Sequence, residues 1–226
     1  MARILLIETA TASLSVALSV DGKVTVQRIA DSPRQQAALT APLIKEVLDS
    51  EGLKVKDCDA VCLSKGPGSY TGLRVGSSTA KGLCFGAGIP LIAVGTLDTI
   101  VAGVKDAADF HRIVPMIDAR RMEVYCACFS PSGERLSEVE PLIIDENSFA
   151  GELSGGPVLF IGDGALKCRS VINSSNAHFR EAFPMAADMA ALAEKAFKEK
   201  RFENTAYFEP FYLKDFVAAL PHNKLF

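Results

Sequence analysis

The chain has 226 residues, long enough for one large domain or two small ones with a sizeable buried core. Hydrophobic residues make up 49% and charged residues 23%, a balance typical of globular proteins that argues against wholesale disorder. The formal net charge of −3 argues against a dedicated nucleic-acid-binding protein, but it leaves open a subunit whose partners hold the RNA.

The amino-terminal segment predicts three strands. An apolar run at residues 4–7 is followed by a polar turn and then by an alternating segment at residues 13–20. The dipeptide Asp21-Gly22 is a typical hairpin turn into the third strand.

The next segment, SPRQQAALTAPLIKEVLDSEG, predicts a helix. Leu39, Leu43 and Val47 recur on one side at helical spacing, and Gly52 stands where the helix would end. Pro42 falls inside this pattern and predicts a kink or a later start. The remaining elements of this half are predicted as a strand at 60–63, a helix at 73–85, a strand at 90–94 and a helix at 97–104.

The same order of elements begins again near residue 112. Aligning Asp118 with Glu8 places Ile117 on Ile7, and the segment VLFIGDG at 158–164 repeats the strand and glycine turn of VCLSKGPG at 61–68. Two such matches in the same order indicate a duplicated α/β unit. We expect one lobe at residues 1–106 and a second, reduced lobe at 107–226, with its best helix at 186–202 and a short carboxy-terminal tail.

A duplicated unit of three antiparallel strands followed by helix–strand–helix–strand is the architecture of the actin-like, or ASKHA, superfamily, which includes actin, Hsp70 and sugar kinases. The predicted fold class is therefore α/β, with two lobes that each hold a mixed β-sheet flanked by helices. In that superfamily ATP lies in the cleft between the lobes, where glycine turns approach the phosphates with backbone N–H groups.

No segment indicates secretion or membrane insertion. The amino terminus, MARILLIETA, is too short for a secretory signal, and no stretch approaches the roughly 18 uncharged apolar residues of a membrane span. We therefore expect a cytoplasmic protein. The six cysteines stand in apolar segments without a CxxC pair, which predicts buried, reduced thiols rather than a zinc or redox site.

The stretch SKGPGSYTGLRVG, residues 64–76, has two interpretations. It is a phosphate cradle with Gly66, Gly68 and Ser69 as candidate ligands, or it is structural, with the two glycines in unusual backbone conformations and Ser69 and Thr71 capping a helix that starts near residue 73. We favour the structural interpretation. A kinase would also need glycine in place of Ala10 and in the glycine-free second turn, DARRM, so we do not expect ATP hydrolysis.

The second turn concentrates charge. Asp118, Arg120, Arg121 and Glu123 form either a solvated hairpin with local ion pairs or a turn that faces a partner across the cleft from Glu8. The second interpretation makes Glu8, Asp118, Arg120 and Glu123 candidate cleft residues.

Five blocks of sequence resemble one family in order along nearly the whole chain, from about residue 3 to about residue 218. The blocks are ILLIETATASLSVAL, KGPGSYTGLRVGSSTAKGL, PLIAVGTLDTI, MIDARRMEVYCA and PFYLKDFVA. On these motifs the chain resembles the bacterial TsaB (YeaZ-like) family of tRNA threonylcarbamoyladenosine (t6A) biosynthesis proteins.

The resemblance implies a non-catalytic partner of the related subunit TsaD, which transfers a threonylcarbamoyl group to an adenosine of tRNA. It implies a heterodimer with TsaD, a platform for the ATPase TsaE, and contact with tRNA only through the complex. The sequence leaves open a homodimer when the chain is alone. TsaD-like proteins bind a metal through a histidine pair where Thr96 and Ile100 stand here, so no metal site is expected. No cofactor is expected either, except ATP or ADP at an interface within the complex.

The resemblance also implies that the helix with Leu39, Leu43 and Val47 and the helix that starts near Leu73 form the partner surface, to which Tyr70 and Arg74 would add. The alternative is that these leucines and Val47 pack on their own sheet. Relatives often carry a histidine where Gln36 stands, so no proton carrier is expected there. Two other functions stay open, a glycoprotease-type peptidase and a small-molecule kinase of the actin-like superfamily.

Overall fold

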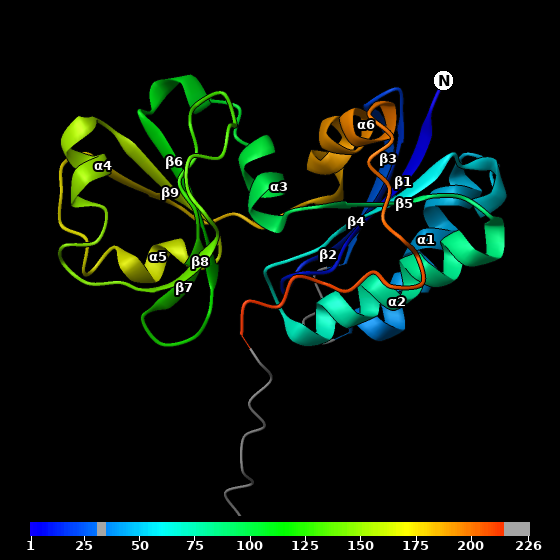
Figure 1. Cartoon of the computed structure of the whole chain (residues 1–226), viewed down its shortest axis with the longest axis horizontal. Helices are drawn as coiled ribbons and strands as arrows, with labels where there is room; N and C mark the ends of the chain where they lie inside the picture. Colours follow the sequence, from blue (N-terminus) through cyan, green and yellow to red (C-terminus); the bar gives the residue numbers. More distant parts are fainter. Residues whose placement is uncertain (31–34, 215–226) are drawn as a thin grey trace, which may run out of the picture.

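The protein, described here from a computed structural model over residues 1–30 and 35–214, has two lobes that lie side by side (Figure 1). Each lobe is built on a five-stranded mixed sheet, with strand order β3-β2-β1-β4-β5 in the first and β10-β9-β6-β7-β8 in the second. The predicted two-lobed actin-like α/β architecture is thus confirmed.

The first sheet follows the predicted order of elements. A central strand pairs antiparallel with the second strand of the hairpin and parallel with the strand that precedes the glycine loop. Asp21 and Gly22 turn the hairpin with φ values of 50° and 75°, the left-handed region that this type of turn requires. The strands are β1 (Arg3–Glu8), β2 (Leu14–Val20), β3 (Lys23–Ala30), β4 (Ala60–Ser64) and β5 (Leu91–Val94).

Two long helices, α1 (Gln36–Ser50) and α2 (Tyr70–Ala87), cover the outer face of this sheet, with a short 3-10 turn at Val55–Asp57 between them. Pro42 lies inside α1, whose chain leaves the helix near Gly52 at a φ of 65°. α2 begins three residues before the predicted start because Ser69 caps it and accepts a hydrogen bond from the Gly72 N–H at 3.3 Å.

The second sheet repeats the first. Its central strand pairs antiparallel with one neighbour and parallel with the other, as β1 does, so the duplication inferred from the sequence holds at the level of strand pairing. The outer face carries two short helices in place of the long pair. The elements are β6 (Arg112–Asp118), β7 (Glu123–Cys126), β8 (Glu140–Ile143), α4 (Ala150–Gly155), β9 (Val158–Ile161), α5 (Ala165–Cys168) and β10 (Ala177–Arg180), after a 3-10 turn at Ala107–Asp109.

The two halves exchange their closing helices. The helix α3 (Thr96–Ala102) follows β5 but packs through Leu97 and Ile100 on the inner face of the second sheet. The 3-10 turn η3 (Ala186–Met189) and α6 (Ala190–Lys198) follow β10 but pack on the inner face of the first sheet. The division into 1–106 and 107–226 stays a prediction, since each half supplies a helix to the core of the other.

After α6 the chain runs back over the first lobe. The Glu203 N–H donates to the Leu91 carbonyl at 2.8 Å, and Phe208 is buried in the outer core of the lobe. Lys81 on α2 donates to the carbonyls of Ala206 and Phe208, which holds this segment against the helix. The predicted carboxy-terminal tail lies outside the described residues. No helix within residues 1–30 and 35–214 is long and apolar enough to cross a membrane.

Candidate functional site

The glycine-rich loop connects β4 to α2 at the edge of the first lobe. Gly66 has a φ of 113°, which only glycine adopts readily, and a cis peptide bond joins it to Pro67. The Ser69 N–H donates to the Ala10 carbonyl at 2.6 Å, so the loop is bonded directly to the turn between β1 and β2.

The glycines that follow fit against that same turn. A β-carbon at Gly68 would lie 2.3 Å from the Ala10 carbonyl oxygen, and one at Gly72 would lie 2.0 Å from the Thr9 carbonyl oxygen. The Thr9 hydroxyl donates to the Gly72 carbonyl at 2.8 Å. These glycines therefore allow the loop and α2 to approach the β1–β2 turn of the chain itself. This contact agrees with a structural role for the loop. A phosphate site at Gly66, Gly68 and Ser69 stays a prediction.

Glu8 ends β1 and is completely buried, so it does not line an open cleft. Its Oε1 accepts a hydrogen bond from the Ala10 N–H at 2.6 Å, and its Oε2 has no hydrogen-bond partner among the described residues. Burial raises the pKa of this carboxyl to about 8, against the opposing effect of the Ala10 N–H and the Ser64 hydroxyl. The backbone N–H that would approach a phosphate in this superfamily is thus bonded to a carboxyl group of the protein.

The second turn, between β6 and β7, is an exposed hairpin with local ion pairs. Asp118 accepts a hydrogen bond from the Arg120 N–H at 2.8 Å and forms an ion pair with Lys167. Arg120 and Arg121 have φ values of 74° and 52°, so two arginines occupy the left-handed conformation usually taken by glycine or asparagine. Among the described residues, no hydrogen bond or ion pair joins this turn to Glu8.

A contact that the sequence did not reveal joins the two lobes through the carboxy-terminal segment. The Phe211 N–H donates to the Lys65 carbonyl beside the glycine loop at 2.7 Å. Three residues later, Lys214 forms an ion pair with Glu123 on the second turn, with Nζ 2.5 Å from Oε2. The motif PFYLKDFVA was the available signal for this segment, but an irregular chain has no periodicity from which its path could be predicted.

Tyr70 and Arg74, predicted at a partner surface, lie beside this segment. The Tyr70 and Tyr212 rings are 5.0 Å apart, and the Arg74 guanidinium lies 4.1 Å from the centre of the Tyr70 ring. Both residues therefore lie at the start of α2, next to the carboxy-terminal segment, and they do not line the space between α1 and α2.

The leucines and the valine predicted for the partner surface lie mainly inside the lobe. Leu43, Val47 and Leu73 are 7%, 0% and 1% exposed, and Leu39 is partly buried against the same core. Their side chains pack on the first sheet, which is the alternative that the sequence left open. A partner surface on α1 and α2 must therefore use other side chains.

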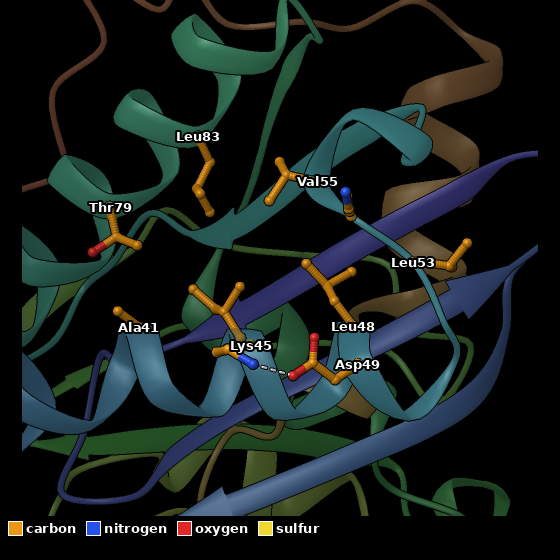
Figure 2. Close-up of a pocket in the computed structure, with 10 residues that line it drawn as sticks. Ala41, Lys45, Leu48, Asp49, Leu53, Val55, Thr79 and Leu83 are labelled. Atoms are coloured by element: carbon orange, nitrogen blue, oxygen red, sulfur yellow. Dashed lines mark hydrogen bonds and ion pairs between the residues drawn. The ribbon is translucent and has the colours of Figure 1, made fainter.

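A groove lies between the two helices, lined in part by Ala41, which is exposed, and by Thr79 and Leu83, which are partly buried. The space between the helices has a volume of about 300 Å³ and is also lined by the buried Leu48 and by Val55. Figure 2 shows Ala41 and Leu48 on α1 and Thr79 and Leu83 on α2. An ion pair between Lys45 and Asp49 lies along α1 at this groove. The groove is mainly apolar and open to solvent, as a helix-packing surface would be.

A smaller cavity of about 240 Å³ lies between the lobes. It is lined by the cis peptide Gly66-Pro67, by Leu97 on α3 and by Arg135 of the second lobe. Arg135 forms a bidentate ion pair with Asp98 on α3, with Nη2 at 2.8 and 2.5 Å from the two carboxylate oxygens. This pair ties the closing helix of the first half to the lobe on which it packs.

Thr96 and Ile100 stand where TsaD-like proteins carry a metal-binding histidine pair, and both lie in the protein interior. The Thr96 hydroxyl is 2.8 Å from that of Ser64. Within residues 1–30 and 35–214, no group of three or more His, Cys, Asp or Glu side chains has an arrangement that could hold a metal ion.

The duplicated lobes, the exchanged closing helices and the glycine loop at the lobe edge define a protein of the actin-like superfamily. A solved structure of an activator of 2-hydroxyisocaproyl-CoA dehydratase from Clostridium difficile shares this fold, with a TM-score of 0.50 at 9% identity over 88% of this chain and 97% of that one. YeaZ from Pseudomonas aeruginosa is far more similar, with a TM-score of 0.83 at 25% identity over 94% of this chain and 100% of that one.

Sequence relatives narrow the class to one family. The tRNA threonylcarbamoyladenosine biosynthesis protein TsaB of Escherichia coli is 34% identical over 96% of both chains, and that of Haemophilus influenzae is 29% identical over 95% of this chain and 94% of the relative. The family described as TsaD, tRNA N6-adenosine threonylcarbamoyltransferase, matches residues 31–221. The chain belongs to the TsaB family, which confirms the resemblance read from its motifs.

Proposed function

We propose that this chain is a non-catalytic subunit in the synthesis of t6A on tRNA, where it binds and activates a TsaD-type threonylcarbamoyltransferase. The role in t6A synthesis is supported by the names of its relatives in Escherichia coli and Haemophilus influenzae. The non-catalytic role is supported by the glycine loop, whose glycines fit against Thr9 and Ala10 where related folds bind phosphate. That contact is the observation that carries the proposal.

The surface proposed for the partner is the outer face of α1 and α2. Besides the groove, the exposed side of α2 is open: a β-carbon at Gly82 or at Gly86 would meet no atom within 4 Å. Phe85, next to them, is 87% exposed, and Ala41 is exposed on the facing helix. Small and apolar residues together permit close packing of a helix from another subunit.

We propose the same surface for a homodimer and for the larger complex. Without its partner, the chain would cover this face with a second copy through the same residues, as a homodimer. In the complex, the pair of subunits would present a platform for a TsaE-type ATPase. ATP or ADP would bind at an interface within that complex rather than to this chain alone, and the work on tRNA would place the protein in the cytoplasm.

The test combines this chain with its cognate TsaD-type transferase. Wild-type protein should elute with the transferase in gel filtration and should increase t6A formation on unmodified tRNA. Ala41→Glu, which puts a charge into the groove, should abolish both effects. Ala191→Glu makes the same change on the exposed side of α6 and should abolish neither.

Two outcomes would count against the proposal. If the wild-type chain neither binds the transferase nor changes t6A formation, the subunit role is wrong. If Ala41→Glu behaves as Ala191→Glu does, the partner binds elsewhere. Magnesium-dependent ADP release or cleavage of a defined protein by the isolated chain would instead favour the kinase or the peptidase.

A further inference from the structure

The carboxy-terminal segment contacts both the start of α2 and the second turn, away from the groove between α1 and α2. We call this region the seam surface and define it by Tyr70, Arg74, Arg120, Arg121, Tyr212 and Lys214. The Tyr70 and Tyr212 rings are 5.0 Å apart at one end, and the ion pair of Lys214 with Glu123 connects this end to the second turn. The surface therefore spans both lobes.

Positive charge exceeds negative charge on this surface. Lys214 and the neighbouring Lys167 are paired with Glu123 and Asp118. Arg74, Arg120 and Arg121 are exposed, and none of the three has an acidic partner among the described residues. These three arginines, without an acidic partner in the part of the chain that the structure describes, contrast with the net charge of −3.

The two arginines of the second turn are held in place by the backbone. The Glu123 N–H donates to the Arg120 carbonyl at 3.1 Å and closes a tight turn in which both arginines have positive φ. A positive φ is unfavourable for a residue with a side chain, so arginine occurs at these two positions against the local backbone preference. Guanidinium groups bind phosphate oxygens through charge-assisted, often bidentate hydrogen bonds, so two adjacent arginines on this turn suit a polyanion.

Aromatic rings accompany the arginines. Tyr212 is 36% exposed and the preceding Phe211 is 42% exposed, on a segment fixed by the Phe211–Lys65 backbone hydrogen bond. Exposed rings beside arginine stack on unpaired bases, whereas bases inside a duplex are not accessible to them.

We infer that the seam surface binds the single-stranded loop of an RNA, with bases stacked on Tyr212 and phosphates bound by Arg74, Arg120 and Arg121. This inference rests on the proposed role in tRNA modification. It departs from the sequence-based expectation that tRNA is reached only through other subunits. A protein partner is the competing occupant, because tyrosine and arginine are also common in protein interfaces. Three exposed arginines that have no acidic partner within residues 1–30 and 35–214 favour a polyanion.

The experiment measures fluorescence anisotropy of a labelled anticodon stem-loop RNA with the full chain, over a series of salt concentrations. A fully paired RNA hairpin of equal length serves as the comparison and should bind more weakly. The double variant Arg120→Gly/Arg121→Gly removes two charges at positions that glycine prefers, so its melting temperature should equal or exceed that of the wild type. In a plot of the logarithm of the binding constant against the logarithm of the salt concentration, the slope is negative. The double variant should make this slope shallower by about 1.4, since each phosphate contact on a single strand contributes about 0.7.

Two further variants separate stacking from charge. Tyr212→Ala should weaken binding of the stem-loop about 5-fold to 100-fold, whereas Tyr212→Phe should bind as the wild type does. Arg28→Gln removes an exposed arginine from β3, at the far edge of the first sheet, and should leave the salt slope unchanged.

The inference fails if the stem-loop does not bind at low salt, or if the Arg120/Arg121 variant has the wild-type slope. It also fails if these variants lose the transferase complex and keep RNA binding, which would make the seam surface a protein interface. Loss of RNA binding with an intact transferase complex supports the inference. An absent transferase complex in the wild type contradicts the proposed function instead, so the two failures are distinguishable.

Discussion

Thr9 and Gly76 fit against each other so closely that a β-carbon at Gly76 would stand 2.3 Å from Thr9 Oγ1. Gly72 and Gly76 on α2, together with Gly68 in the loop before it, therefore allow close contact with the β1–β2 turn. Glycine-rich loops before a helix are usually interpreted as anion sites. Here the atoms that the glycines admit belong to the protein itself.

Gly76→Ala should destabilise the protein by about 1–2 kcal/mol, because the added methyl group overlaps Thr9 Oγ1 although alanine is the better helix former. Gly82→Ala on the same helix meets no atom within 4 Å and should stabilise by about 1 kcal/mol. Urea unfolding measures both. Equal effects of the two changes would contradict the close fit, and adding Thr9→Ala to Gly76→Ala should recover part of the loss.

The buried carboxyl of Glu8 should make stability depend on pH. Its pKa is about 8 in the folded protein against an ordinary value of 4.5, so the folded state holds a proton that the unfolded state releases between these values. The free energy of unfolding should therefore fall by about 5 kcal/mol as the pH rises from about 4.5 to about 8, and it should change little above pH 8.

Glu8→Gln should remove this decline, because glutamine does not ionise and its side-chain oxygen can still accept the Ala10 N–H. Unfolding curves from pH 5 to pH 9 provide the measurement, with Glu46→Gln on the exposed side of α1 as the matched change. If wild type and Glu8→Gln keep a constant difference across this range, Glu8 is not protonated in the folded protein.

The exchanged helix α6 should be essential to the first lobe. Ala193 is fully buried against the sheet, so Ala193→Glu should cost more than about 3 kcal/mol by placing an unpaired charge in an apolar core. Ala191→Glu on the exposed side of the same helix should stay within about 0.5 kcal/mol of the wild type. Similar melting temperatures for the two variants would show that α6 does not pack as described.

The thiols should resist modification in the native protein. All six cysteines are buried, and desolvation raises their pKa, to about 11 for Cys58, Cys84 and Cys168. Because the thiolate is the reactive form, labelling with a disulfide reagent at pH 8 should be far slower in buffer than in urea. A thiol that reacts at the same rate in both would reveal local opening.

The sequence predicted the architecture better than the surfaces. Alternation, the Asp21-Gly22 turn and the repeat around Asp118 are local signals, and strand pairing follows from them. Helical periodicity showed that Leu43 and Val47 share a side of α1, but it cannot say whether a sheet or a partner lies opposite.

Local sequence patterns could not predict which residues distant in the sequence contact one another. Glu8 was predicted as a cleft residue opposite the second turn, yet it is completely buried and accepts the Ala10 N–H. The path of the segment before Lys214 and the exchange of α3 with α6 are set by contacts between residues distant in sequence, which no local pattern encodes.

The exchange of closing helices has a consequence for synthesis on the ribosome. The inner face of the first sheet, with Ile4, Leu6 and Cys62, packs against residues 186–198. That face has no cover until most of the chain has been translated, so the amino-terminal lobe cannot complete its core first, as a lobe made from one continuous segment would. Nascent chains that stall before this point would expose an apolar sheet, and we expect them to be bound by chaperones that recognise such surfaces.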